Sequence, residues 1–258
     1  MSRVCPLFVI VLIASVLGAE ESGWKPLFNG KNLDGWIPKI TGHDMGVNAH
    51  DTFQVDDGVL KVSYANYDQF DEQFGHLYSE KPYSHYKLRM EYLFVGEMMP
   101  DAPHYVNLNS GFMVHSQSAE SMKRDQRFPV SVEFQFLADE GKGHRQTGNV
   151  CTPGTTVEID GELIMQHIVK STAPTFPADR WISVEIEVRG GEEIIHRVEG
   201  KDVLRFQKPS LDPTDTKFGA WDLIRPGRPL LLDSGHIALQ AEGQGIWFRN
   251  IEIMELDP

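Results

Sequence analysis

The sequence predicts an all-β fold, a sandwich of antiparallel sheets, from three observations. Several short segments alternate apolar and polar residues with the period of two that is typical of half-buried strands. Turn-forming residues are frequent, with 23 Gly and 15 Pro among the 258 residues. No long segment repeats its apolar residues with the period of an amphipathic helix. Short strands separated by Gly, Pro and Asp turns are the usual pattern of a β-sandwich.

Two segments alternate most strictly, residues 86–92 and 182–188, where charged residues separate the apolar ones. The sequence Glu199-Gly200-Lys201-Asp202 is a hairpin turn signal and predicts a strand directly after it. Strands are therefore expected at residues 86–92, 111–115, 131–137, 182–188, 203–206, 237–240 and 246–256. These segments follow one another without a linker of low complexity, which indicates one domain.

The first 19 residues have the features of a secretory signal peptide. Arg3 supplies a positive charge, residues 4–17 form an apolar run, and Leu17-Gly18-Ala19 offers small residues for cleavage. The run is shorter than the roughly 20 residues that span a bilayer, which favours cleavage over an uncleaved anchor. We therefore expect one mature domain over residues 20–258, secreted or periplasmic, with no membrane contact after cleavage.

Cleavage also changes the charge and the cysteine count. Removing 19 of the 258 residues leaves 239, and Arg3 is the only charged residue lost, so the formal net charge falls from −13 to −14. Cys151 becomes the only cysteine, which excludes an intrachain disulfide. The acidic balance argues against nucleic acid and against an anionic membrane surface as partners. A neutral or weakly charged small ligand remains.

Three predicted strands carry one apolar face and one face with polar residues. Glu133 and Gln135 share a face of residues 131–137, His115 lies on the polar face of residues 111–115, and Gln240 and Glu242 share a face of residues 237–242. A solvated outer face is the alternative for any one of these strands. Amides, a histidine and small residues together favour a concave sheet that binds a polyhydroxylated ligand.

Several short motifs follow one another in a fixed order from Trp24 to Glu255. The opening segment, residues 27–36, reads LFNGKNLDGW. The later motifs are Asn109-Ser110-Gly111, Val132-Glu133-Phe134-Gln135, Thr147-Gly148-Asn149-Val150, Asp179-Arg180-Trp181, residues 235–240 (GHIALQ) and residues 248–253 (FRNIEI). Together they resemble the 3-keto-disaccharide hydrolase domain family, whose opening reads LFNGKDLSGW.

This resemblance implies a concanavalin A-like jelly-roll sandwich of two antiparallel sheets, export from the cytoplasm, and cleavage of glycosides that carry a ketone at C3. The chain departs from the family pattern at three places. His115 stands where the family commonly has Arg, Ala241-Glu242 stands where it has a His-Gly pair, and Ile182 replaces the Asn that follows Trp181. These changes bear on the identity of the sugar.

A ketone at C3 acidifies the proton at C2, so a base can remove it, the group at C1 leaves, and water adds to the resulting enone. This route needs one general base and a group that stabilises the enolate oxygen. Glu133 is the candidate base, and sheet burial would raise its pKa toward the working range. His115 is the second candidate, as base or as metal ligand. A structural role for either residue is the alternative.

The remaining candidates are substrate-binding residues. Asn109, Gln135 and Gln240 are expected to bind sugar hydroxyls. Glu242 is expected to be a ligand, a base or an exposed charge, and the sequence leaves these open. Trp247 is a candidate for stacking on a sugar ring, with core packing as the alternative.

A divalent metal is a further possibility, because His104, His115, Glu133 and Glu242 offer nitrogen and oxygen ligands that would stabilise an enolate. No helical His or Glu spacing supports such a site, so no cofactor is assigned. Two other functions compete with the enzyme: a non-catalytic, lectin-like carbohydrate-binding domain and a structural surface domain.

Overall fold

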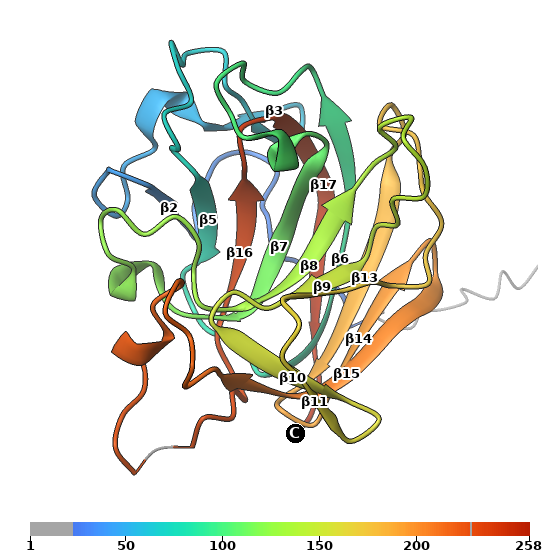
Figure 1. The fold of residues 1–258 in the computed structure, drawn as a ribbon. Helices are drawn as coiled ribbons and strands as arrows, with labels where there is room; N and C mark the ends of the chain where they lie inside the picture. The colour runs from blue at the N-terminus through green and yellow to red at the C-terminus, as the bar shows by residue number, and fades with distance from the viewer. Residues whose placement is uncertain (1–22, 228) are drawn as a thin grey trace, which may run out of the picture.

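Two antiparallel sheets face each other across an apolar core in the computed structural model (Figure 1). The structure describes residues 23–227 and 229–258, so the predicted signal peptide at residues 1–19 lies outside the described residues. One sheet has ten strands and the other has seven. This arrangement confirms the prediction of an all-β, concanavalin A-like jelly-roll sandwich.

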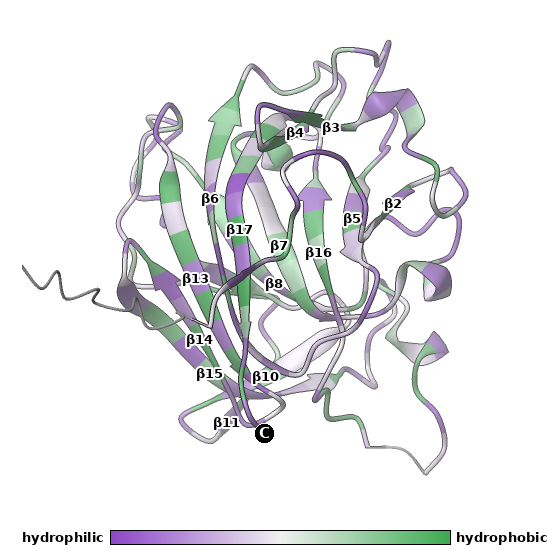
Figure 2. Ribbon diagram, turned by 180° about the vertical axis from the view of Figure 1, so that it is seen from behind, coloured by the Kyte–Doolittle hydropathy of each residue, from purple (hydrophilic) through white to green (hydrophobic). Residues whose placement is uncertain are grey.

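The ten-stranded sheet is the layer on the far side of the core in Figure 1, and Figure 2 shows it from its outer face. Its strands lie in the order β11 (Glu162–Ile164), β10 (Thr155–Ile159), β15 (Lys201–Leu211), β14 (Glu193–Val198), β13 (Ile182–Arg189), β6 (His85–Val95), β17 (Gly245–Glu255), β4 (Val59–Val62) and β3 (Phe53–Asp56). The short strand β1 (Lys25–Pro26) pairs with β17. Figure 2 shows hydrophobic and hydrophilic residues alternating along β13 and β17, as the sequence predicts.

The seven-stranded sheet carries the polar face that the sequence singles out. Its order is β12 (Ile168–Val169), β9 (Asn149–Cys151), β8 (Val132–Leu137), β7 (Asn109–Ser116), β16 (His236–Ala241), β5 (Gly75–Ser79) and β2 (Trp36–Ile40). The helices of the described residues are all short 3-10 turns: η1 (Ala49–Asp51), η2 (His104–Val106), η3 (Ala119–Ser121) and η4 (Ala220–Asp222). None of these described helices is long and apolar enough to cross a membrane.

All the predicted strands are present, and their alternation sets which side chains enter the core. Phe134 and Phe136 of β8 point into the sandwich, and Phe136 stacks on Tyr92 of β6 with ring centroids 4.1 Å apart. The hairpin predicted from Glu199-Gly200 joins β14 to β15, where Val198 pairs with Lys201. Each large side chain buried in this core contributes roughly 1.5–3 kcal/mol to folding. A core of this size stabilises the domain without a disulfide, and Cys151 is a free thiol.

Candidate active site

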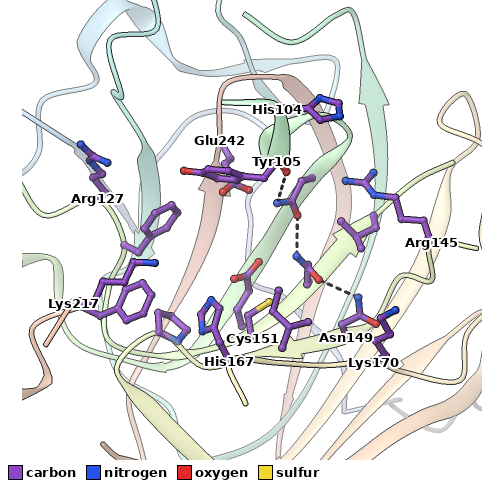
Figure 3. A pocket seen from close by; sticks show the side chains of 18 of the residues that line it. His104, Tyr105, Arg127, Arg145, Asn149, Cys151, His167, Lys170, Lys217 and Glu242 are labelled. Carbon is purple, nitrogen blue, oxygen red and sulfur yellow. Dashed lines mark hydrogen bonds between the residues drawn. The ribbon is translucent and has the colours of Figure 1, made fainter. Parts of the chain in front are cut away.

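A cavity of about 820 Å³ opens on the face of the seven-stranded sheet that points away from the core (Figure 3). Its floor comes from β7, β8 and β9, and its walls come from loops. Figure 3 shows Arg127 and Lys217 on one side of the cavity and Arg145 and Asn149 on the other, with Cys151 between them. Four of the predicted site residues line it: Asn109, Glu133, Gln135 and Glu242.

Glu133 lies at the centre of the floor. It stands on β8 between Met113 of β7 and Cys151 of β9, and 7% of its surface is exposed. Burial raises the pKa of its carboxyl group to about 8, which a weak hydrogen bond from the Cys151 thiol only partly offsets. The group is therefore largely protonated at neutral pH, and its ionised form is a stronger base than an ordinary carboxylate.

Gly111 makes the room that the carboxyl group of Glu133 occupies. A β-carbon on this residue would lie 2.7 Å from Glu133 Oε1 and 2.6 Å from the carbonyl oxygen of Phe134. Both distances are shorter than any stable contact of a methyl group, so only glycine fits here. The Asn-Ser-Gly motif at residues 109–111 thus has a physical reason for its last residue.

Glu242 supplies a second buried carboxyl group, directly after β16. Only 4% of its surface is exposed, and its Oε2 atom has no hydrogen-bond partner among the described residues. Burial and the nearby charge of Glu133 raise its pKa well above the usual range, while Arg145 acts in the opposite direction. Two coupled carboxyl groups with raised pKa values hold at least one proton between them at neutral pH.

Three amides, which we call the amide row, continue the floor beyond Glu133. Gln135 donates to Asn109 Oδ1 at 3.2 Å and accepts from Asn149 Nδ2 at 3.0 Å (Figure 3). Asn109 in turn donates to the carbonyl oxygen of Tyr105. These bonds fix the orientation of each amide and leave one N–H of Asn109 and one of Gln135 free for a ligand.

Arg145 lies at the rim of the cavity, next to the amide row, and binds the backbone of two loops there. Its guanidinium donates to the carbonyl oxygens of Leu108 and Ala138, each at 2.9 Å, and to that of Asn107 at 2.8 Å. The loop before β7 is therefore tied to the loop after β8. Tyr105 lies on the same rim, and 53% of its surface is exposed. Partial burial raises the pKa of its hydroxyl group, and the nearby charge of Glu242 raises it further.

The opposite wall is aromatic, and we call Phe128, Phe218 and His167 the aromatic wall. The rings of His167 and Phe218 stack with centroids 5.3 Å apart. The side-chain amide of Gln126 donates to the carbonyl oxygens of both Phe128 and Phe218, which binds the two loops together. Lys217 Nζ lies 4.9 Å from the centroid of the Phe218 ring.

The structure corrects the predicted orientation of His115. The residue does not line the cavity; its Nε2 atom lies 2.9 Å from the carbonyl oxygen of Gly190, in the turn that joins β13 to β14 of the facing sheet. A β-bulge in β7 is the cause, because two residues of β7 oppose one of β16 there and His115 has a φ of 48°. The extra residue reverses the alternation, and burial lowers the pKa of the imidazole to about 4.

Two further predicted residues lie outside the cavity. Gln240 is on the expected face of the seven-stranded sheet but is buried opposite His76, and its Oε1 atom has no partner among the described residues. Trp247 is on β17, in the other sheet, and Lys61 Nζ lies 4.6 Å from its ring centroid. Neither residue contacts the ligand space, so Trp247 does not serve as the predicted stacking platform.

The proposed metal ligands do not come together. Glu133 and Glu242 line the cavity and His104 lies on its rim, but His115 faces the other sheet. Among residues 23–227 and 229–258, no group of three or more His, Cys, Asp or Glu side chains is arranged to hold a metal ion.

The loops supply site residues that strand periodicity does not reveal. These are Tyr105, Arg127, Phe128, Arg145, His167, Lys217 and Phe218. Asn149 belongs to Thr147-Gly148-Asn149-Val150, one of the motifs that carry the family resemblance, and this motif is the only sequence feature that draws attention to Asn149. Because the walls are made by loops from distant parts of the chain, no local sequence pattern predicts which loop residues line the cavity.

A jelly-roll sandwich with a polar cleft on one sheet is an architecture shared by lectins and by enzymes that cleave glycans. The chain belongs to the 3-keto-alpha-glucoside-1,2-lyase-like domain family, which it matches over residues 23–254. This membership confirms the resemblance and supports a carbohydrate-active function of the hydrolase or lyase type. No curated protein matches the chain.

Solved structures share the fold. A proposed glycosyl hydrolase from Parabacteroides distasonis ATCC 8503 is 22% identical, with a TM-score of 0.52, over 90% of this chain and 99% of that one. A second structure of such a protein from the same organism is 19% identical, with a TM-score of 0.52, over 91% and 94%. A Bacillus subtilis protein of unknown function with a galectin-like fold is 12% identical, with a TM-score of 0.54, over 90% and 94%.

Proposed function

We propose that the protein is an exported enzyme that cleaves 3-keto-glycosides by proton abstraction and elimination, followed by addition of water. The observation that carries the proposal is the buried carboxyl pair, Glu133 and Glu242, on the floor of a cavity with free amide donors. Family membership supports the reaction type. Export is proposed from the apolar run at residues 4–17.

Glu133 removes the proton from C2, and the electrons of the C–H bond move toward the ketone oxygen at C3. Its raised pKa suits this role, because a base near neutral pKa combines availability with proton affinity. The free N–H groups of Asn109 and Gln135 are placed to hydrogen-bond to the developing enolate oxygen. Because the amide row is already oriented by its own hydrogen bonds, it needs little reorganisation during the reaction.

Glu242 serves as the acid of the pair. When the enolate reforms the ketone, the C1–O bond breaks, and the proton held by Glu242 passes to the departing oxygen. Burial, and the charge that Glu133 carries once it has lost its proton, raise the pKa of Glu242, so Glu242 keeps its proton while Glu133 acts as the base. The elimination is then balanced: Glu133 gains a proton, Glu242 loses one, and the sugar becomes an enone that adds water.

The test is incubation of the purified protein with a 3-keto-disaccharide, following release of the leaving sugar. We expect turnover by the native protein and a loss of at least about a hundredfold in both Glu133→Gln and Glu242→Gln, since general acid–base groups contribute roughly 10²–10⁴. Saturable sugar binding without turnover by the native protein would contradict the enzyme and establish a lectin-like domain. Unchanged turnover in Glu133→Gln would contradict the assignment of the base.

A further inference from the structure

The cavity has two chemically different ends, and the pairing of β8 with β9 fixes their order. Directly before β8, the backbone N–H of Ser131 donates to the carbonyl oxygen of Pro153; along β8, Glu133 pairs with Cys151 and Gln135 pairs with Asn149. Pro153 lies at the aromatic wall, because a β-carbon on the adjacent Gly154 would lie 3.3 Å from Phe218. The base Glu133 therefore separates the aromatic wall from the amide row.

Each end suits a different half of a glycoside. Oriented amides match the hydroxyl and keto groups of a sugar ring. The aromatic wall offers two phenyl rings and an imidazole, and the amide of Gln126 beside them is already bonded to the carbonyl oxygens of Phe128 and Phe218. The cavity, at about 820 Å³, is also large enough for a sugar together with a sizeable group beyond it.

Charged side chains accompany the wall, because Asp125, Arg127 and Lys217 all line the cavity, in a chain with a net charge of −13. Lys217 is exposed at the wall, over the Phe218 ring, and makes no ion pair among the described residues. Arg127 lies on the same side of the cavity (Figure 3), where it pairs with Glu72. A cation next to stacked rings favours an aromatic ligand that carries a negative charge.

We infer that the aromatic wall binds an aromatic, negatively charged leaving group, such as a phenolic acid joined to the sugar through oxygen. This inference rests on the proposed function and deepens it by naming the aglycone. The sugar lies over the amide row, the glycosidic oxygen lies above the carboxyl pair, and the aromatic acid stacks beside Phe218 with its carboxylate toward Lys217.

The test measures binding of the free leaving group, so it needs no chemistry. Isothermal titration calorimetry of the purified protein with 4-hydroxycinnamate should give saturable binding, with weaker binding of the neutral 4-hydroxycinnamamide and of the non-aromatic cyclohexanecarboxylate. Phe218→Ala should weaken binding of 4-hydroxycinnamate about tenfold, as expected for the loss of a stacking partner. Lys217→Gln should remove the preference for the acid over the amide.

Matched controls and a catalytic variant separate this inference from the proposed reaction. Trp221→Ala removes an exposed aromatic ring of the same loop that does not line the cavity, and Lys201→Gln removes an exposed lysine elsewhere. Both should bind like the native protein. Glu133→Gln should also bind, even if no 3-keto-glycoside is cleaved. Absent binding, equal binding of cyclohexanecarboxylate, or an unchanged affinity in Phe218→Ala would overturn the inference.

Discussion

Replacing Glu133 by Gln should inactivate the enzyme and, at neutral pH, make the fold more stable. Burial raises the pKa of this carboxyl group from 4.5 to about 8. Between these two values the folded protein holds a proton that the unfolded chain has released. Stability therefore falls as the pH rises through this window, since the folded state binds more protons than the unfolded state.

The size of the effect follows from the shift. Each pH unit within the window costs about 1.4 kcal/mol, so the folded state is about 3 kcal/mol less stable at pH 7 than at pH 4.5 because of Glu133 alone. Gln has the shape of the protonated carboxyl group and does not titrate, so Glu133→Gln removes this cost. For a domain of this size about 3 kcal/mol corresponds to a rise in melting temperature of about 6–12 °C at pH 7.

The assay is differential scanning calorimetry of the native protein and Glu133→Gln from pH 4.5 to pH 8. The difference in melting temperature should be near zero at pH 4.5 and grow as the pH rises. Glu120→Gln, which neutralises an exposed carboxylate on η3, is the matched control and should show no such growth. A difference that is independent of pH, or a variant that is less stable at pH 7, would refute the buried, protonated state of Glu133.

Three more predictions follow from the same contacts. The value of kcat/KM should rise with pH from about pH 5 toward pH 8 as the carboxyl pair releases its first proton, and a profile that is flat over this range would contradict the pair as the acid and base. Gly111→Ala should lower kcat at least about a hundredfold, because the added methyl group overlaps the carboxyl group of Glu133. Steady-state kinetics of the folded variant measures this loss of kcat. His115 and His196 are both buried with pKa values lowered to about 4, so their contribution to stability is complete above about pH 6.5 and is lost as the pH falls to about 4. His196→Phe should reduce the loss of stability between pH 7 and pH 4.5 by up to about 3 kcal/mol, as urea unfolding at the two pH values would show.

Strand periodicity predicted the sheet that carries the site, because a strand with one buried face has an apolar residue at every second position. The alternation in residues 131–137 placed Phe134 in the core and Glu133 and Gln135 on the opposite face, as the structure has them. The same logic failed at His115 because a bulge adds a residue to β7, and the alternation of the sequence gives no sign of it. A physical trace of the bulge exists in Gly235, where a β-carbon would lie 2.5 Å from the α-carbon of His115.

The walls could not be predicted in this way. Phe128 and Phe218 are ninety residues apart in the sequence, and the amide of Gln126 donates to the carbonyl oxygens of both. Trp247, by contrast, is predicted as a stacking residue, with core packing as the alternative. Its strand, β17, belongs to the other sheet, and the alternation of a strand carries no information about which sheet it joins.

The polar face of the seven-stranded sheet contains buried polar atoms that have no hydrogen-bond partner among the described residues. Among the described residues, buried side-chain atoms without a hydrogen-bond partner include both ring nitrogens of His76, Oε1 of Gln240 and Oε2 of Glu242. All three residues lie on the polar face of the seven-stranded sheet, where Gln240 pairs with His76. Each such atom costs roughly 1–3 kcal/mol, which a domain with an apolar face in its place would avoid. The facing side of the same strands is packed with Phe and Ile, so the sequence is able to fill a sheet face with apolar residues. Unpartnered buried atoms also occur in the core, at His115 Nδ1 and His196 Nε2, and His76 and Gln240 do not line the cavity. Glu242 is the one of the three polar-face residues that lines the cavity, so its unpartnered oxygen is the cost that a bound substrate would offset.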